Sequence, residues 1–372
     1  MNTLSASHPL SDGRTSTSPL VQALHGFRPD RLPVWFMRQA GRSLPEYRKL
    51  REGTSMLDAC LDPQLAAEIT MQPVRRHGVD AAIFFSDIVI PLKLAGVDVE
   101  IVPGRGPVFA NPIRTARDVA QLREEHPAER LRQAMTPIRE TVQLLIAELE
   151  STPLIGFAGA PFTLAAYLVE GGPSRDHLQA RSLMHTDPIA WRDLLAWAAE
   201  LSGVFLEGQA HAGASAVQLF DSWAGSLSVQ DYAAHVAASS MHTLEAVREL
   251  HYVDPQGDGY STRSLPLPTV HFAVGADHLL HEFAKLETSA IGIDWRIPLD
   301  EASRRLEDTR TLQGNLNPAL LFASPEALEF HVREVIDRGR RAPAHILNLG
   351  HGVPPETDPA VLTRVVELAH AY

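Results

Sequence analysis

The stretch DPIAWRDLLAWAAELSGVFLEGQAHAG (187–213) is followed after two residues by AVQLFD (216–221), and this pair of segments is the unit from which the fold can be predicted. Asp187 precedes Pro188, a combination typical of a helix N-cap followed by a first-turn proline. Apolar residues then recur at three- and four-residue intervals, which indicates a helix with one buried face: Trp191, Leu194, Leu195, Ala198, Leu201 and Phe205. The second segment is short and almost wholly apolar, as strands buried on both faces of a parallel sheet are.

The same alternation runs along the whole chain. Strands are predicted at 33–37, 80–86, 153–159, 216–221, 268–274, 290–295, 310–315 and 345–350. Helices are predicted at 61–77, 128–149, 187–213, 227–249, 298–308, 325–339 and 359–371. Strands that alternate with helices in this way predict an α/β fold, here a single-domain (β/α)8 TIM barrel. An open, doubly wound sheet is the alternative that the pattern alone leaves standing.

The domain organisation follows from composition. Residues 1–20 are rich in Ser and Thr and are predicted to form a disordered N-terminal arm. Residues 21–372 contain no long linker and are predicted to form one barrel domain that carries the catalytic site. Two further segments stand out: 96–112 alternates around Gly104 and Gly106 like a projecting hairpin, and 253–266 is polar like a surface loop or insertion.

Charge and cysteine content exclude several classes of function. The chain has 45 acidic against 33 basic residues and a formal net charge of −12, so a broad nucleic-acid-binding face is not expected. The single cysteine, Cys60, excludes an internal disulfide and a cysteine-rich metal site, which fits a reducing cytoplasm. No segment approaches the roughly 20 apolar residues of a membrane span. We therefore expect a cytoplasmic protein that binds neither nucleic acid nor membrane.

Chemistry in a barrel of this kind is expected where the strands run out at their C-terminal ends. Polar residues at the ends of the predicted strands or in the segments that follow them are distant in sequence but would meet at one end of the barrel: Arg38, Arg42, Asp87, Tyr167, Ser222, Asp294 and His351. Arginine forks bind carboxylate or phosphate groups in a bidentate manner, so this set predicts an anionic ligand. An aspartate directly after a buried strand is poorly solvated and can accept N–H donors or stabilise a developing positive charge.

Each of these residues also has a plain structural interpretation. The arginines can belong to a solvated charged surface, as Arg48 and Lys49 close behind them can. Asp87 can cap a helix or pair with an arginine, and Tyr167 and Ser222 can be packing and turn residues. A serine hydrolase is not favoured, because FDSWAG (220–225) lacks the G-x-S-x-G motif.

A metal site and a phosphate site are the alternatives to the anion site predicted from the arginines. The pair His278 and His281 has metal-ligand spacing but no acidic or cysteine partner nearby, so no metal is predicted. Glycine-rich segments at 313–315 and 349–352 fall where many barrels bind phosphate, although no phosphate-loop or dinucleotide motif accompanies them.

Taken together, the segments resemble one known family. PVWFMRQAGRSLPEYRKLR (33–51), FFSDI (84–88), GFAGAPFTLAAYLVEGG (156–172), QLFDSWAG (218–225), GIDWR (292–296), LQGNL (312–316) and NLGHG (348–352) are similar to motifs of uroporphyrinogen decarboxylases. The resemblance extends from about residue 20 to the C-terminus. The family usually has an aspartate where this chain has Asn317, so any charge expected there is missing.

The resemblance implies a cofactor-free and metal-free (β/α)8 barrel, usually a homodimer. Such an enzyme converts the four acetate side chains of uroporphyrinogen III to methyls, giving coproporphyrinogen III and carbon dioxide. By similarity, Asp87 receives the pyrrole N–H groups and Arg38 acts with it in catalysis. The resemblance assigns substrate contacts to Arg38, Gln39, Ala40, Gly41, Arg42, Arg51, Asp87, Tyr167, Ser222 and His351.

Two other functions remain open at this point. A corrinoid-dependent methyltransferase of the same superfamily would need a zinc-binding His/Cys set, which Cys60 alone does not supply. A non-catalytic tetrapyrrole carrier would need only the arginines and Asp87.

Overall fold

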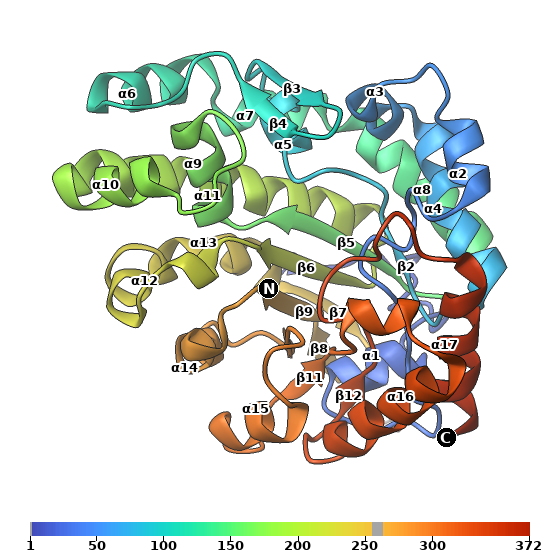
Figure 1. Ribbon diagram of the computed structural model, residues 1–372. Helices are drawn as coiled ribbons and strands as arrows, with labels where there is room; N and C mark the ends of the chain where they lie inside the picture. The colour runs from blue at the N-terminus through green and yellow to red at the C-terminus, as the bar shows by residue number, and fades with distance from the viewer. Residues whose placement is uncertain (1, 255–262) are drawn as a thin grey trace.

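The computed structural model describes residues 2–254 and 263–372 (Figure 1). Its centre is a seven-stranded parallel sheet with the order β12-β11-β10-β9-β6-β5-β2. The strands are β2 (Ala82–Ile83), β5 (Leu154–Gly159), β6 (Ala216–Asp221), β9 (Thr269–Ala273), β10 (Ala290–Gly292), β11 (Thr311–Gln313) and β12 (His345–Ile346). All six residues of β5 are buried, as the uninterrupted apolar pattern predicted.

The segment predicted as the first strand, 33–37, closes this sheet into a barrel. Val34 forms a parallel bridge with Leu347, just after β12, and its carbonyl accepts the N–H of Asp80 at 2.8 Å, just before β2. Asp80 also accepts the Val34 N–H through Oδ2 at 2.8 Å. The eight predicted segments therefore surround one axis, and the single-domain (β/α)8 TIM barrel is confirmed rather than the open sheet.

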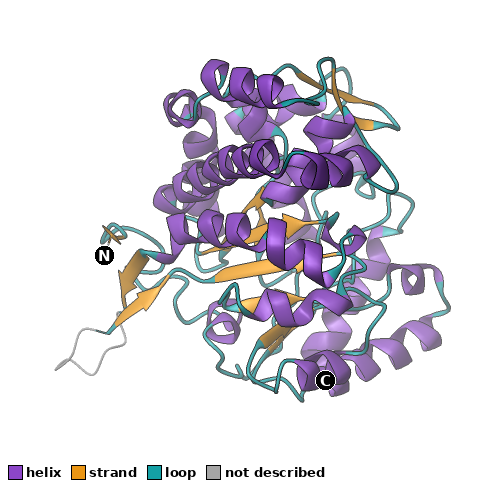
Figure 2. Ribbon diagram, turned by 90° about the vertical axis from the view of Figure 1, so that its left-hand side faces the viewer, coloured by secondary structure: helices purple, strands orange, loops and turns teal. Residues whose placement is uncertain are grey.

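Helices surround the strands in chain order (Figures 1 and 2). The helices between successive strands include α4 (Pro63–His77), α8 (Thr136–Leu149), α11 (Pro188–Ala212), α13 (Ala237–Arg248), α14 (Leu280–Ala284), α15 (Leu299–Arg305), α16 (Pro325–Gly339) and α17 (Pro359–Ala371). The decisive helix of the sequence, α11, begins as predicted, because Asp187 Oδ1 accepts the Ala190 N–H at 3.0 Å.

Two helices predicted as continuous are each divided in two. The 128–149 segment forms α7 (Ala128–Ala134) and α8, and Pro137 lies in the first turn of α8, where its missing N–H costs least. The 227–249 segment forms α12 (Val229–His235) and α13, separated at Val236, whose φ of −130° is not helical. The first break is marked by a proline in the sequence, whereas the second is revealed only by the backbone angles.

Additional short elements lie at the strand ends and between the principal helices. They are α1 (Pro19–Leu24), α2 (Pro45–Leu50), α3 (Met56–Leu61), α5 (Ile90–Leu94), α6 (Ala116–Glu125), α9 (Pro161–Glu170) and α10 (Leu178–Thr186). Strands β3 (Val99–Val102) and β4 (Gly106–Phe109) form the antiparallel hairpin predicted within 96–112. Strands β7 (Leu250–Val253) and β8 (Ser264–Pro266) flank the predicted loop, whose residues 255–262 lie outside the described part of the chain.

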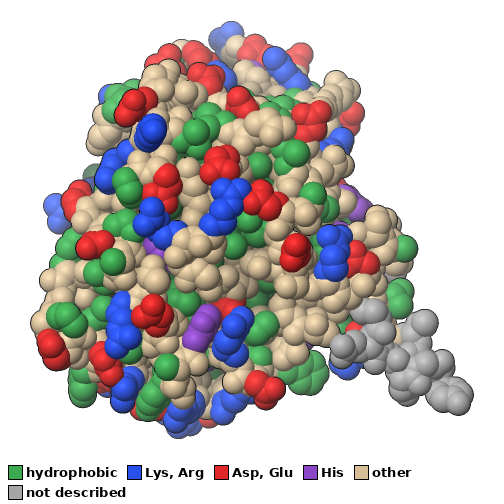
Figure 3. Space-filling model, turned by 90° about the vertical axis from the view of Figure 1, so that its right-hand side faces the viewer, with side chains coloured by type: hydrophobic (Ala, Val, Ile, Leu, Met, Phe, Trp, Pro, Cys, Tyr) green, Lys and Arg blue, Asp and Glu red, His purple; other side chains and the backbone are tan. Residues whose placement is uncertain are grey.

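Acidic and basic side chains are mixed on the outside of the helical layer. On the face shown in Figure 3, Lys and Arg side chains lie among Asp and Glu side chains, and the described residues form no broad basic area there. Surface charges also pair between helices, as Arg75 on α4 does with Glu148 on α8 at 2.5 Å.

The prediction of a disordered arm over residues 1–20 is wrong for the described residues 2–20. Strand β1 (Asn2–Thr3) pairs in parallel with β7, and the side chains of Leu4 and Leu10 are buried. The buried ring of His8 contacts the Ala210 carbonyl through Nε2 at 3.0 Å. A few well-placed apolar side chains thus hold a segment whose average composition is polar.

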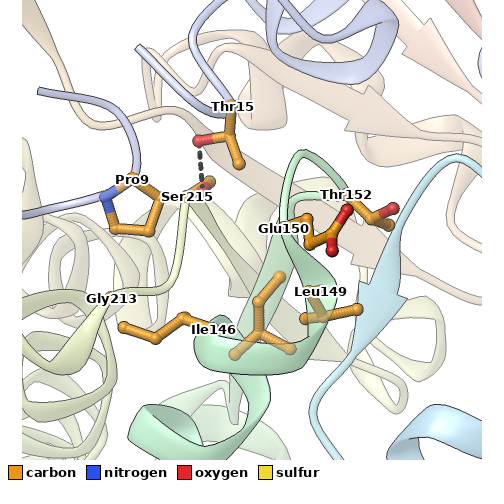
Figure 4. Close-up of a pocket in the computed structure, with 9 residues that line it drawn as sticks. Pro9, Thr15, Ile146, Leu149, Glu150, Thr152, Gly213 and Ser215 are labelled. Carbon is orange, nitrogen blue, oxygen red and sulfur yellow. Dashed lines mark hydrogen bonds between the residues drawn. The ribbon is translucent and has the colours of Figure 1, made fainter. Parts of the chain in front are cut away.

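The N-terminal segment covers the end of the barrel where the strands begin. Thr15 Oγ1 and Ser215 Oγ, just before β6, are 2.8 Å apart in a small pocket that Pro9 and Glu150 also line (Figure 4). None of the candidate site residues lines this pocket. In barrel enzymes this end contributes to stability and the opposite end carries the catalytic residues, so the active site is expected at the C-terminal ends of the strands.

Candidate active site

The loop after the first strand holds Arg38 in an unusual backbone conformation. Arg38 has a φ of 61°, a left-handed value that side chains other than glycine seldom adopt. A Cβ on Gly41 would lie 3.0 Å from the Arg38 carbonyl oxygen, which is why glycine suits this turn. Arg38 and Arg42 are both exposed, and neither forms a salt bridge with a carboxylate of the described residues. Their guanidinium groups are therefore available to an external anion.

The Gln39 side chain is bonded within the protein. Its side chain is fully buried; Oε1 accepts the Phe36 N–H at 2.9 Å and Nε2 donates to the Ala81 carbonyl at 3.0 Å. These two bonds tie the loop to the segment that leads into β2. The Gln39 side chain therefore holds the loop in place, whereas Ala40 and Gly41 remain partly exposed.

Asp87 follows β2 and keeps much of its acceptor capacity. Oδ1 accepts the Val89 N–H at 3.1 Å, and no other side chain or N–H of the described residues donates to this carboxylate. Burial raises the pKa of Asp87 above its ordinary value, while the Val89 N–H and the Arg38 charge act in the opposite direction. A partly exposed carboxylate with a free oxygen suits N–H donors supplied by a ligand.

Tyr167 lies in an aromatic stack that the sequence did not reveal. Its ring stacks on Trp223 with centroids 3.8 Å apart, and the ring centroid of His177 lies 4.3 Å from that of Trp223. Burial raises the pKa of Tyr167 to about 12, with the Asp87 charge raising it and the Arg38 charge lowering it. The Tyr167 hydroxyl is therefore protonated and uncharged, and the charges of Asp87 and Arg38 both influence its pKa.

Ser222 lies between Asp221 and Trp223, and both of these residues form a hydrogen bond with Thr163. Thr163, on α9, donates from Oγ1 to the buried Asp221 Oδ1 at 2.9 Å, and Thr163 Oγ1 accepts the Trp223 N–H at 3.4 Å. Ser222 itself is partly exposed. The end of β6 and the start of α9 are thus joined, which places Ser222 and Tyr167 on adjacent segments.

His351 follows β12 and approaches the Arg38 loop. The aliphatic part of Arg38 lies over Gly352, where an added Cβ would be only 2.4 Å from Arg38 Cδ. The Val353 N–H donates to the Met37 carbonyl at 2.9 Å. Burial lowers the pKa of His351, and the charges of Arg38 and Arg296 lower it further. The first and last strands of the barrel therefore bring Arg38 and His351 together.

Two predicted residues have more internal partners than expected. Arg51, at the end of α2, donates from Nη1 to the Ser55 carbonyl and lies over the Tyr47 ring at 5.9 Å. Asp294 accepts the Arg296 N–H at 2.9 Å and forms a salt bridge with its guanidinium. Arg296, which lies over the Trp295 ring at 4.0 Å, was missed because its signal in the sequence is a single charge after a strand.

One member of the histidine pair His278 and His281 has a structural role. His278 Nε2 contacts the Leu227 carbonyl at 2.8 Å, which joins the segments that follow β9 and β6. Within residues 2–254 and 263–372 the site brings together arginines, one partly exposed carboxylate, a tyrosine, a serine and a histidine. This set can bind a polyanion and stabilise a cation at one point within it.

Comparison with known proteins identifies the family. The family described as uroporphyrinogen decarboxylase (URO-D) matches residues 15–372. The uroporphyrinogen decarboxylase of Leifsonia xyli is 60% identical over 99% of this chain and 98% of its own length. That of Arthrobacter sp. is 60% identical over 97% of this chain and 99% of its own length. The chain belongs to the uroporphyrinogen decarboxylase family.

As a member of the uroporphyrinogen decarboxylase family, the protein is an enzyme of the carboxy-lyase class. Among solved structures, a methyltransferase from Methanosarcina mazei aligns with a TM-score of 0.76 over 95% of this chain and 98% of its own, at 16% identity. That likeness concerns the barrel alone. Among the described residues, no helix has the length and apolar character needed to span a bilayer.

Proposed function

We propose that the protein removes the four acetate carboxyl groups of uroporphyrinogen III as carbon dioxide and forms coproporphyrinogen III in porphyrin and haem biosynthesis. The observation that carries the proposal is Asp87, a carboxylate with a free oxygen in the field of Arg38 and Tyr167. A cyclic tetrapyrrole offers pyrrole N–H donors on its inside and carboxylates on its outside. Asp87 and the arginines have the complementary arrangement.

The chemistry requires no cofactor, because the substrate provides the electron sink. A proton added to a pyrrole carbon makes that ring cationic. The bond between the acetate CH2 and its carboxylate then breaks, carbon dioxide leaves, and the electron pair neutralises the ring. A second proton converts the resulting methylene to methyl, and loss of the first proton from the ring carbon restores the neutral pyrrole, so that one proton is consumed overall. Asp87 stabilises the cationic ring, and such preorganised charge contributes about 3–4 kcal/mol per well-placed group.

The arginines bind the carboxylates that do not react. An arginine that held the reacting carboxylate strongly would stabilise the ground state and slow its conversion to neutral carbon dioxide. A guanidinium is also a poor acid at neutral pH, because its pKa exceeds about 12. Arg38 is accordingly assigned to orienting the substrate and to lowering the pKa of Asp87. Water or a substrate carboxyl is the proton donor compatible with this site.

Anaerobic incubation with uroporphyrinogen III, followed by chromatography of the oxidised products, tests the proposal. Products with seven, six, five and finally four carboxyl groups are expected. A tetrapyrrole carrier would bind the substrate without any loss of carboxyl groups. Methyl transfer from a corrinoid to a thiol, with no decarboxylation, would instead support the methyltransferase alternative.

Arg42→Leu is expected to act on substrate binding. Loss of one charge-assisted contact of roughly 1.5–3 kcal/mol should raise KM by about 10- to 100-fold with a smaller effect on kcat. Lys49→Leu, an exposed cation on α2, removes the same charge and is the matched control. Equal KM values for the two variants would contradict a specific role for Arg42.

The pH dependence of kcat/KM should report the influence of Arg38 on Asp87. Asp87 must be ionised, and the Arg38 charge lowers its pKa. Arg38→Met removes that effect, so the pKa of Asp87 should rise and the acid limb of the profile should move to higher pH. Arg38→Lys keeps the charge, and its profile should stay near that of the wild type. An unshifted acid limb in Arg38→Met would exclude the coupling.

The resemblance also implies a homodimer, and the buried, unoxidised thiol of Cys60 is compatible with a reducing cytoplasm. We include both in the proposal. The molar mass of the native protein in solution, measured by light scattering, distinguishes a dimer from the 40.8 kDa monomer.

A further inference from the structure

Three side chains from two helices converge away from the substrate-binding residues. His185 lies in the last turn of α10, and Asp231 and His235 lie four residues apart on α12, therefore on one face of that helix. One ligand atom from each residue can be chosen so that all three lie within 4.8 Å of one another. His185 Nε2 is 3.4 Å from Asp231 Oδ1, and the two imidazole rings are nearly perpendicular, at 85°.

This donor set matches the preferences of a borderline divalent metal ion. Two imidazoles and one carboxylate are ligands of Zn²⁺, with bonds of about 2.0–2.2 Å. In a tetrahedron with such bonds, neighbouring ligand atoms are separated by about 3.3 Å. The contact between His185 and Asp231 already has this spacing. Hard ions such as Mg²⁺ prefer oxygen ligands and are not favoured here.

The backbone that carries the three residues is well anchored. The His235 carbonyl accepts the indole N–H of the buried Trp191 at 3.2 Å, and the Asp231 N–H donates to Ser228 Oγ at 3.0 Å. The His185 side chain is 55% exposed and that of Asp231 is 20% exposed. The side chains of His185 and Asp231 are therefore accessible to an ion from solvent, and the backbone beneath them is fixed.

We propose that His185, Asp231 and His235 form a surface site for Zn²⁺ or a similar divalent transition-metal ion. The ion would join α10, which packs on α9 and α11, to α12, which packs on α13 and α14. Helix α10 follows the segment that carries Tyr167, and α12 follows Ser222, so the ion braces the two segments that the stack of Tyr167 and Trp223 already connects. Water fills the remaining coordination position, and the site takes no part in decarboxylation.

Calorimetric titration of the tag-free, metal-free protein with ZnCl2 tests the site directly. One equivalent of Zn²⁺ should bind more tightly than any other, and His185→Ala or His235→Ala should each weaken that binding by at least about tenfold, because even outer-sphere partners have effects of this size. His211→Ala is the matched control, because His211 and Glu207 form an exposed two-ligand pair on α11, 3.9 Å apart. Its removal should leave the tight equivalent unchanged.

A second readout separates ligation from misfolding. Zn²⁺ bound to the folded state should raise the Tm of the wild type and of His211→Ala, but not that of His185→Ala or His235→Ala, and MgCl2 should raise none of them. Binding should weaken on acidification, because protons compete for the imidazoles. Equal Zn²⁺ affinity in all four proteins, or no tight equivalent in the wild type, would overturn the proposal. Uroporphyrinogen turnover is not used as a readout, so the two proposals can fail separately.

Discussion

Asp87→Asn should lower kcat by about 10²- to 10³-fold while the protein remains folded. The substitution keeps the size of the side chain and one oxygen for the Val89 N–H, which Asp87 Oδ1 accepts at 3.1 Å. It removes the negative charge that stabilises a protonated pyrrole. Single-turnover decarboxylation under anaerobic conditions measures the chemical step directly, and a variant with full activity would rule out this role for Asp87.

Stability provides the control for this variant. Burial raises the pKa of Asp87 above its ordinary 3.8, so the folded protein holds this proton more tightly than the unfolded chain does. The free energy of unfolding therefore falls as pH rises from the ordinary pKa through the raised one. The Asp87→Asn variant has no titrating group at this position, so its free energy of unfolding at pH 7 should be at least that of the wild type. The difference between the two proteins should vanish below pH 3.8. A less stable variant at pH 7 would mean that lost activity reflects folding.

Asp80→Ala should produce the largest loss of stability, about 3 kcal/mol. The Asp80 side chain is 1% exposed, and its carboxylate forms a salt bridge with Arg31. It also accepts the Val34 N–H at 2.8 Å and contacts His370 Nε2 at 2.7 Å. Removing it leaves a buried Val34 N–H without an acceptor at the seam where the first strand closes the barrel. The midpoint of urea denaturation is the measurement.

Asp337→Ala is the matched control for Asp80. Asp337 pairs with Arg340 at 3.0 Å, but its side chain is 50% exposed, so its loss should cost less than about 1 kcal/mol. Because Arg38 follows the same strand, a partly opened seam should also raise KM in Asp80→Ala. Equal denaturation midpoints for the two variants would show that the seam does not depend on this carboxylate.

The sequence predicted the barrel, and grouped the candidate site residues, for one physical reason. Buried parallel strands have an apolar pattern that can be read locally, and the C-terminal ends of parallel strands meet at one end of the sheet. Arg38, Asp87 and His351 could therefore be grouped although they are far apart in the chain. The electrostatic coupling of Arg38 to both of the others agrees with that grouping.

Local pattern was a poor guide to the direction of individual side chains. Gln39 lies in the arginine loop, yet its amide is directed inward to Phe36 and Ala81. The contacts of Trp223 with Tyr167 and His177 were not predicted, because they join segments that follow different strands. The N-terminal segment was misjudged because Leu4 and Leu10 are isolated in a polar stretch, whereas the segment is held by distant partners, as β1 is by β7 and His8 is by Ala210.

The amino-acid sequence by itself determined the alternation of helices and strands, the polar residues near the ends of several strands and the two arginines after the first strand, since each depends on neighbours within a few positions. Tertiary structure alone decided which of those side chains lie close together and which are hydrogen-bonded within the loops, as Gln39 is. It also decided that His185, Asp231 and His235 lie next to one another. The reason is that hydrophobic periodicity records whether a residue is buried, whereas binding and catalysis depend on distances between residues that only the closed chain brings together.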